Sequence, residues 1–219
     1  MLRTLLALAS ALVLAACSGG AAQDGSKADI AKVLDVKSSF GPEFKTSTVA
    51  PTGIDPRLLA PQAVPSGAVF DPSDCAKAAT GLVVPPGLKG NMAATTAEGD
   101  GNRFIVIAVE TSEPLQMPDP GDSCKKVAFA GGGARGLVEV VESPAIDGAR
   151  TLGTHRVVQT KVDGKPATGE LYNYVASFST FMVIVTANPL VEPNKPVAPV
   201  NTQRARDLLS AAVGAVRGT

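Results

Sequence analysis

The chain has 219 residues with 20 basic and 20 acidic side chains, so its formal net charge at pH 7 is zero. Without an excess of positive charge it has no general attraction to nucleic acid or to anionic lipid, and nucleic-acid binding is excluded from the expected activities. Only 4% of the residues are aromatic and none is tryptophan, so the core has to be built mainly from Val, Leu, Ile and Ala.

The N-terminus has the pattern of a lipoprotein signal peptide. Arg3 gives a short basic start, and residues 5–16 are apolar except for Ser10. This stretch is shorter than the roughly 20 residues that a membrane-spanning helix needs. Leu14-Ala15-Ala16-Cys17 matches the lipobox, in which small residues expose the backbone to the signal peptidase and the cysteine thiol receives the lipid. We therefore expect a signal peptide over residues 1–16, and a Cys17 that carries diacylglycerol and palmitate at the extracytoplasmic face of the cell membrane.

Lipidation of Cys17 leaves Cys75 and Cys124 as a pair, whereas three free cysteines would leave an exported protein with an odd thiol. The space outside the membrane is oxidising enough for a structural disulfide. We predict a bridge between Cys75 and Cys124. Closing a loop of about 50 residues would stabilise the fold by at most about 4 kcal/mol in the chain-entropy model.

Residues 17–27 are typical of a flexible tether because they are rich in Gly, Ala and Ser. We expect residues 28–219 to form one domain.

Ser26, with Asp29 three residues later, predicts the start of a helix that ends before Gly41-Pro42. A second helix is predicted with Asp71 as N-cap, Pro72 at the first helical position and Gly81 at the end. Cys75 would then lie on this second helix.

From Asn91 to Asn188 the composition is typical of antiparallel β structure, with short Gly-containing turns between apolar runs. The turns include Gly99-Asp100-Gly101-Asn102 and Asp163-Gly164, and connections this short exclude parallel crossovers. The expected strands span 91–98, 103–111, 125–130, 137–142, 151–162, 170–177 and 180–187. The sequence thus predicts an α+β fold with a single antiparallel sheet of about five to seven strands. Two to three helices, including a C-terminal one, would pack on this sheet.

Pro193, Pro196 and Pro199 have the spacing of a polyproline II segment, which would serve as a surface strap or as a docking motif for a partner. Asn201 or Thr202 then caps a C-terminal helix that closes at Gly218. Arg204 and Arg206 lie in its first turn, where the helix dipole disfavours cations by a few tenths to about 1 kcal/mol. We expect these two arginines to pair with Asp207 or with a ligand.

No motif singles out a reaction, and we expect no catalytic residue, cofactor or metal site. His155, the one histidine, has no Cys, Asp or Glu beside it at ligand spacing, which favours a structural role. A base or pH sensor beside a distant carboxylate stays open for it. Gly131, Gly133 and Gly136 spell a dinucleotide motif but lead into a predicted strand instead of a helix.

A second misleading match is formed by Ser123 and Lys126, which spell S-x-x-K without the companion motifs of penicillin-binding proteins. A better candidate is a binding face, because Glu170, Tyr172 and Tyr174 alternate onto one side of a strand. These residues could hold a sugar or polyketide ring, or the rings could simply pack across strands or against the C-terminal helix. Together with Arg204 and Arg206 they are the candidate ligand-binding residues.

Five runs of the sequence resemble a family of mycobacterial lipoproteins of unknown function, over roughly Ile30 to Arg217. The resemblance implies no established active site, so no functional residue is transferred. More distantly, the layout is similar to the extracellular sensor domain of a mycobacterial serine/threonine kinase, which has a second disulfide that this chain lacks. The matching runs are Gly90-Asn91-Met92-Ala93-Ala94, Gly101-Asn102-Arg103-Phe104-Ile105-Val106-Ile107-Ala108, Leu171-Tyr172-Asn173-Tyr174-Val175-Ala176, Thr186-Ala187-Asn188-Pro189 and Arg204-Ala205-Arg206-Asp207.

These observations predict a monomeric, membrane-anchored extracytoplasmic lipoprotein. The favoured function is a noncatalytic or sensor-like module that binds a small amphiphile, a cell-wall fragment or a partner protein. An envelope hydrolase is an alternative, which would need a deep pocket where His155 or a serine meets a carboxylate. A structural or assembly accessory protein is another, which would show a large exposed apolar patch and no pocket.

Overall fold

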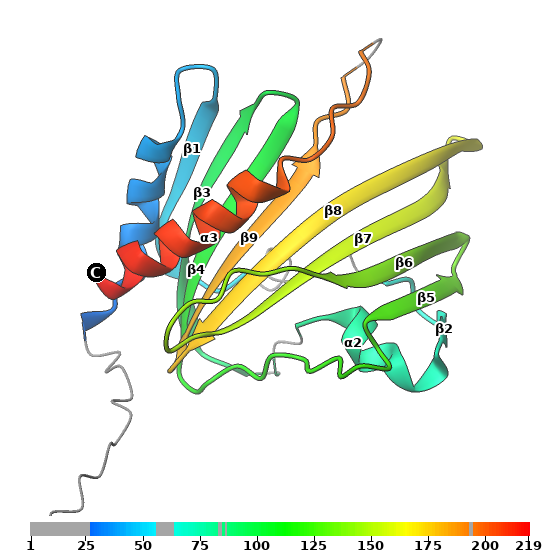
Figure 1. Ribbon diagram of the computed structural model, residues 1–219, viewed down its shortest axis with the longest axis horizontal. Helices are drawn as coiled ribbons and strands as arrows, with labels where there is room; N and C mark the ends of the chain where they lie inside the picture. The colour runs from blue at the N-terminus through cyan, green and yellow to red at the C-terminus, as the bar shows by residue number, and fades with distance from the viewer. Residues whose placement is uncertain (1–26, 56–63, 83–84, 86, 193–194) are drawn as a thin grey trace, which may run out of the picture.

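The computed structural model describes residues 27–55, 64–82, 85, 87–192 and 195–219. The predicted signal peptide and all of the predicted tether except Lys27 lie outside these residues. Over the described part, the chain forms nine strands and three helical segments (Figure 1). The strands are β1 Lys45–Gly53, β2 Val69–Asp71, β3 Gly90–Gly99, β4 Asn102–Thr111, β5 Lys126–Gly131, β6 Ala134–Val141, β7 Arg150–Val162, β8 Lys165–Phe178 and β9 Phe181–Pro189. The helical segments are the 3-10 helix η2 Ile30–Ser39, the 3-10 turn η3 Ser73–Cys75 that leads into α2 Ala76–Thr80, and α3 Thr202–Arg217.

All nine strands belong to one sheet in the order β1-β3-β4-β9-β8-β7-β6-β5-β2, and every neighbouring pair is antiparallel. The single antiparallel sheet is confirmed, but the expected number of five to seven strands was too low. The two strands that sequence patterns missed are the edges of the sheet. β1 is exposed along its whole length, and β2 has only three residues, so neither shows the alternation of buried and exposed positions that marks a strand.

The predicted hairpins are confirmed, and their strands extend to the turns. Asp163 and Gly164 have φ values of 51° and 76°, which suit a two-residue hairpin turn. Pairing therefore continues to Val162 and Lys165, and β8 begins five residues before the predicted start at Glu170.

η2 and α3 pack on one face of the sheet, which we call the helix face. α3 contacts η2, β9, β8 and β4, and η2 contacts β3, β1 and β4 (Figure 1). The main core fills the space between them, and its largest fully buried side chains include Phe104 and Tyr174. Since these contacts leave out β5, β6 and β7, the helix face of those three strands has no described helix over it.

The caps of the two longer helices agree in part with prediction. Asp29 caps η2 by accepting a hydrogen bond from the backbone N–H of Ala31 at 2.8 Å, and the predicted cap Ser26 lies outside the described residues. At α3 the Asn201 side chain accepts a hydrogen bond from the Arg204 N–H at 2.9 Å. Gly218 ends α3 in the left-handed conformation with a φ of 74°. The predicted C-terminal helix is confirmed. None of the helices over the described residues is long and apolar enough to cross a bilayer.

The opposite face of the sheet has two smaller cores. One core is covered by the chain segments that connect the strands. The other core lies under η3 and α2. The second helix begins later than predicted: Asp71 pairs with Ala128 as a residue of β2, so it cannot cap a helix. Cys75 lies in the 3-10 turn before α2. The predicted disulfide between Cys75 and Cys124 is present, and it ties η3 to the segment in front of β5.

Candidate functional site

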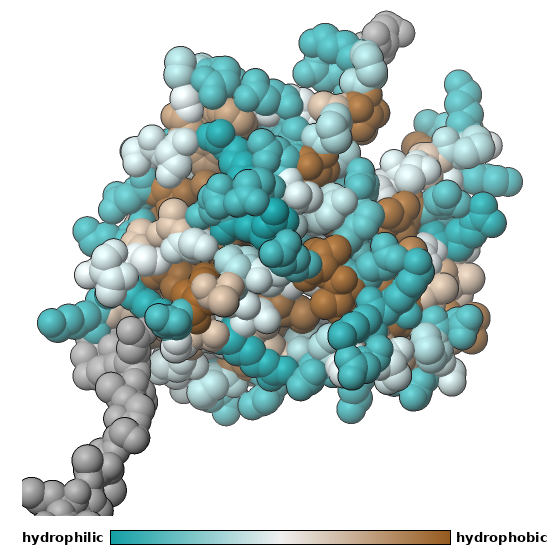
Figure 2. Space-filling view, in the orientation of Figure 1, coloured by the Kyte–Doolittle hydropathy of each residue, from teal (hydrophilic) through white to brown (hydrophobic). Residues whose placement is uncertain are grey.

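The part of the helix face over β5, β6, β7 and the first half of β8 is the first candidate site, and we call it the open face. Side chains that point to this face are half-buried or exposed, whereas several on the other side of the same strands, such as Val127, Phe129 and Val138, are buried. Figure 2 shows apolar surface between α3 and the strands β6 and β7, with hydrophilic side chains around it. The open-face residues are Lys126, Ala128, Arg135, Leu137, Glu139, His155, Val157, Gln159, Glu170 and Tyr172.

A row of four polar residues crosses the open face at right angles to the strands. Lys126 pairs with Glu139, Glu139 with His155, and His155 with Tyr172, so four adjacent strands each contribute one side chain. The Lys126 ammonium donates to Glu139 at 2.7 Å. Directly opposed side chains of antiparallel strands are about 5 Å apart, which is why residues distant in sequence meet here.

His155 lies between two carboxylates. Its Nε2 is 2.9 Å from Glu170 Oε1, and its Nδ1 is 3.8 Å from Glu139 Oε2. The imidazole stacks on the Tyr172 ring, with 4.2 Å between the ring centroids and 11° between the planes. The side chain is 17% exposed. The sequence showed no carboxylate partner for His155, and this reading is corrected: Glu170 and Glu139 reach it from the neighbouring strands.

Burial raises the pKa of the Tyr172 hydroxyl, and the negative charge of Glu170 raises it further. The pKa of Glu139 is lowered, chiefly by its hydrogen bond with Lys126. At neutral pH the row therefore presents an ionised carboxylate at Glu139 and a protonated phenol at Tyr172. The open face thus carries hydrogen-bond acceptors and donors beside two half-buried rings.

Tyr174 is on the same side of β8 but belongs to the core. Its side chain is 1% exposed, and burial raises its pKa. Arg206 and Thr202 of α3 lie close enough to the hydroxyl to lower the same pKa by a smaller amount. For Tyr174 the structure thus shows the packing alternative, a ring against the C-terminal helix.

Arg204 and Arg206 are not brought together with Tyr172. Arg206 reaches Tyr174 and donates to the Gln203 side chain at 2.6 Å. Arg204 lies over the rings of Phe40 and Phe44, at 4.9 Å and 4.6 Å from their centroids. It also donates to the Ser39 carbonyl at 3.0 Å.

These contacts explain why cations are tolerated at the N-terminus of α3. Two cation–π contacts are worth about 0.5 to 1 kcal/mol each at partly exposed sites, which offsets the few tenths to 1 kcal/mol lost to the dipole. We expected Asp207 to pair with Arg204 or Arg206. In the structure Asp207 instead accepts a hydrogen bond from the Gln203 side chain at 2.8 Å.

Beside the polar row the open face has a shallow hollow of about 420 Å³. Ala128, Leu137 and Val157 form its apolar floor, since they pair with one another across β5, β6 and β7. Arg135 and Gln159 stand at its border, and Arg135 donates to Gln159 at 2.8 Å. A flat ligand could therefore contact apolar atoms and charged groups on one surface.

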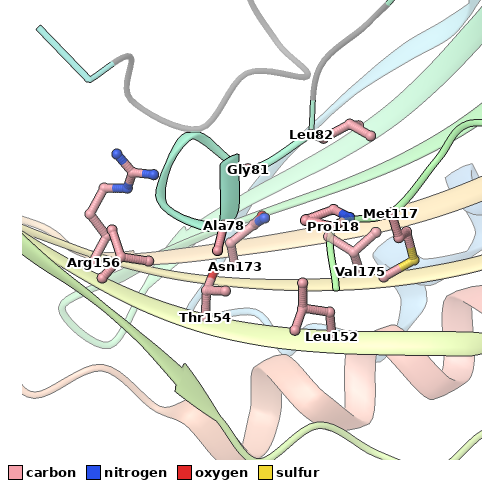
Figure 3. Close-up of a pocket in the computed structure, with 11 residues that line it drawn as sticks. Ala78, Gly81, Leu82, Met117, Pro118, Leu152, Thr154, Arg156, Asn173 and Val175 are labelled. Atoms are coloured by element: carbon pink, nitrogen blue, oxygen red, sulfur yellow. The ribbon is translucent and has the colours of Figure 1, made fainter. Parts of the chain in front are cut away.

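The second candidate site is a narrow cavity of about 30 Å³ between α2 and the opposite face of the sheet (Figure 3). Its walls come from five segments: α2 with the residues after it, Met117-Pro118 between β4 and β5, and the three strands β6, β7 and β8. Leu152, Val175, Met117 and Pro118 gather at one end, and Arg156 lies at the other. The cavity therefore has an apolar end and a cationic end.

Arg156 is buried, with 5% of the residue exposed, and burial lowers its pKa. Its guanidinium donates to the Ala79 carbonyl at 2.5 Å and lies 5.8 Å from the centroid of the Phe129 ring. Nothing in the sequence marked Arg156, because its burial depends on α2, which the Cys75–Cys124 bridge helps to hold beside the sheet.

Over the described residues, no group of three or more His, Cys, Asp and Glu side chains is arranged to hold a metal ion. The glycine motif at Gly131, Gly133 and Gly136 lies in the turn between β5 and β6 and at the start of β6. No helix follows these glycines, so the helix N-terminus of a dinucleotide site is missing there. Phe129 covers Gly136, where an added Cβ would come within 2.4 Å of the ring.

A family model described as a domain of unknown function, DUF5642, matches residues 29–217 of the chain. The chain is also similar to a solved structure from Mycobacterium smegmatis, an uncharacterized protein described as the Rv0999 ortholog. The two share 69% sequence identity with a TM-score of 0.84, and the match covers 89% of this chain and 100% of the other. No curated protein matches the chain.

Proposed function

We propose that this chain, which belongs to the DUF5642 family, is a noncatalytic binding module that lipid on Cys17 holds at the extracytoplasmic face of the cell membrane. The proposed ligand of the open face is a saccharide of the cell envelope. The similarity to a mycobacterial protein supports an envelope of that type. The tether would let the domain reach material close to the membrane surface.

The observation that carries this proposal is the polar row on a part of the sheet that no described helix covers. Glu139 and Glu170 supply carboxylate oxygens that accept hydrogen bonds from sugar hydroxyls. Tyr172 and His155 contribute a stacked pair of rings, and Leu137 and Val157 give an apolar surface for the C–H groups of a sugar ring. Such a mixed surface suits a ligand with both hydroxyl groups and apolar ring faces.

The shape of the surface at His155 favours binding over hydrolysis. His155 does meet two carboxylates, Glu170 and Glu139, as the hydrolase alternative requires, so the depth of the adjoining surface decides between the two functions. The hollow beside it is shallow and open, whereas a hydrolase would need a deep pocket at His155.

The ligand proposal is tested by calorimetric titration of the chain with oligosaccharides released from the mycobacterial envelope. We expect Glu170→Gln to weaken binding by about tenfold, because it removes a charge-assisted hydrogen bond. Glu98→Gln is the matched control, since it breaks an exposed cross-strand pair with Arg103, at 2.6 Å, on β3 and β4. Equal effects of the two substitutions, or no saturable binding by the unchanged chain, would overturn the proposal.

The anchor is tested separately with Cys17→Ser expressed in a mycobacterial host. We expect the unchanged chain to carry acyl mass and to partition with membranes. The variant should be released and should lack that mass. A variant that keeps both properties would show that the membrane attachment does not depend on Cys17.

A further inference from the structure

We infer that the cavity beneath α2 is a second binding site, which takes the alkyl chain of a small anionic amphiphile with its head group at Arg156. The inference does not depend on the saccharide proposal. The cavity lies on the opposite face of the sheet, and its ligand belongs to a different chemical class.

The apolar end of the cavity adjoins a core that is rich in methionine. Met92, Met117 and Met182 all belong to this core, and Met117 also lines the cavity. No other methionine follows the predicted signal peptide. Methionine side chains are unbranched and flexible, so they adjust to guests of different shape more easily than branched residues.

The polar end carries the buried guanidinium of Arg156. Burying a cation in an apolar setting is unfavourable unless hydrogen bonds or an opposite charge compensate it. Arg156 is held in place by the Ala79 carbonyl and by the Phe129 ring. Its charge is therefore fixed at one end of the cavity, where it would attract a carboxylate on a ligand.

The cavity is in a closed form, because about 30 Å³ leaves room for only about two water molecules. A chain would enter by separating Gly81 and Leu82, which follow α2, from Pro118; all three residues line the cavity (Figure 3). The Cys75–Cys124 bridge ties the end of η3 to the segment in front of β5. Opening at the Leu82 end leaves this tie intact.

The test uses residues 17–219 with Cys17→Ser and 13C-labelled methionine methyl groups. Decanoate is added below its micelle concentration, and the three methyl resonances are followed by NMR. We expect a saturable shift of the Met117 resonance that exceeds the shifts of Met92 and Met182. A chain that shows no saturable shift of Met117 overturns the inference.

Two substitutions separate the cavity from nonspecific detergent binding. Ala78→Leu keeps a good helix former in α2 but fills the cavity, so it should abolish the Met117 shift. Arg156→Lys should retain most of the affinity for decanoate. Arg156→Met should reduce it by about tenfold while leaving the affinity for uncharged decanol unchanged. Circular dichroism confirms folding of each variant.

An unaltered Met117 shift in folded Ala78→Leu would contradict the assignment of the site. Equal losses of decanoate and decanol binding in folded Arg156→Met would contradict the role of the charge. If Arg156→Met does not fold, the Ala78→Leu result and the preference of the unchanged chain for decanoate over decanol decide the question.

Discussion

His155 and Tyr172 face each other across β7 and β8 with their rings stacked 4.2 Å apart. The contact joins two residues 17 positions apart on either side of a two-residue turn. It places the ring of Tyr172 at the boundary between the main core and the open face, since Tyr172 also packs against the core cluster. Tyr174, two residues later on the same strand, is entirely inside that core.

The two tyrosines should differ in their contribution to stability. Tyr174→Ala should lower the free energy of unfolding by about 3 to 5 kcal/mol, because it leaves a large cavity beneath α3. Tyr172→Ala should lower it by about 1 to 2 kcal/mol, because the ring is only half-buried. Urea denaturation measures both values. Similar losses for the two variants would contradict the assignment of Tyr172 to the open face.

The alkaline titration of the tyrosines should reflect the raised pKa values. A group whose pKa is raised on folding contributes stability below its unfolded pKa and loses it as the pH rises through the folded value. The unfolded value for tyrosine is about 10, so stability should fall above about pH 10. The chain has two tyrosines and no tryptophan, so absorbance at alkaline pH reports phenolate formation directly.

Substitutions then assign the titration steps. Tyr172→Phe should leave the Tyr174 step alone. Glu170→Gln should lower the pKa of Tyr172, because it removes a nearby negative charge and an acceptor for the phenol proton. A Tyr172 pKa that rises or stays the same in Glu170→Gln would show that the carboxylate is not close to the hydroxyl in solution.

Part of the open face could have been predicted from the sequence. Once Asp163-Gly164 is accepted as a two-residue turn, Val162 pairs with Lys165, and counting back along both strands places His155 opposite Tyr172. Glu139 could not be placed this way. β6 and β7 are joined by the longer segment 142–149, and a connection of that length does not determine the register of the strands.

The cavity beneath α2 could not have been predicted from local patterns. Its walls combine α2, Met117-Pro118 and three strands, so it exists only in the assembled fold. Arg156 lies in a strand, and the alternation of side chains along that strand predicts the face of the sheet to which Arg156 points. The alternation does not predict that α2 covers this face. The edge strands β1 and β2 were missed for a related reason. They are strands because they pair with β3 and β5, and their sequences show no apolar alternation that would predict this.

Loss of the disulfide should destabilise the fold without abolishing the sheet. Cys75→Ala combined with Cys124→Ala should lower the free energy of unfolding by up to about 4 kcal/mol, because the unfolded chain is no longer constrained by a bridge between residues 49 positions apart. Denaturant titration with and without a reductant measures the loss. Cys17→Ser is the control and should leave the midpoint unchanged, and an unchanged midpoint in the double variant would contradict the role of the bridge.

Arg204 tests whether stacking outweighs the unfavourable helix dipole. Arg204→Ala removes two cation–π contacts of about 0.5 to 1 kcal/mol each and a hydrogen bond worth about 1 kcal/mol. It regains a few tenths to about 1 kcal/mol by taking a cation from the first turn of α3. The net loss should be about 1 to 2 kcal/mol in urea denaturation.

Arg204→Lys separates the two effects, because it keeps the charge at the helix terminus but loses the planar guanidinium that stacks on Phe40 and Phe44. Its stability should therefore be close to that of Arg204→Ala, or lower. If Arg204→Ala instead stabilises the protein, the dipole term dominates, and the ring contacts of Arg204 do not anchor the start of α3.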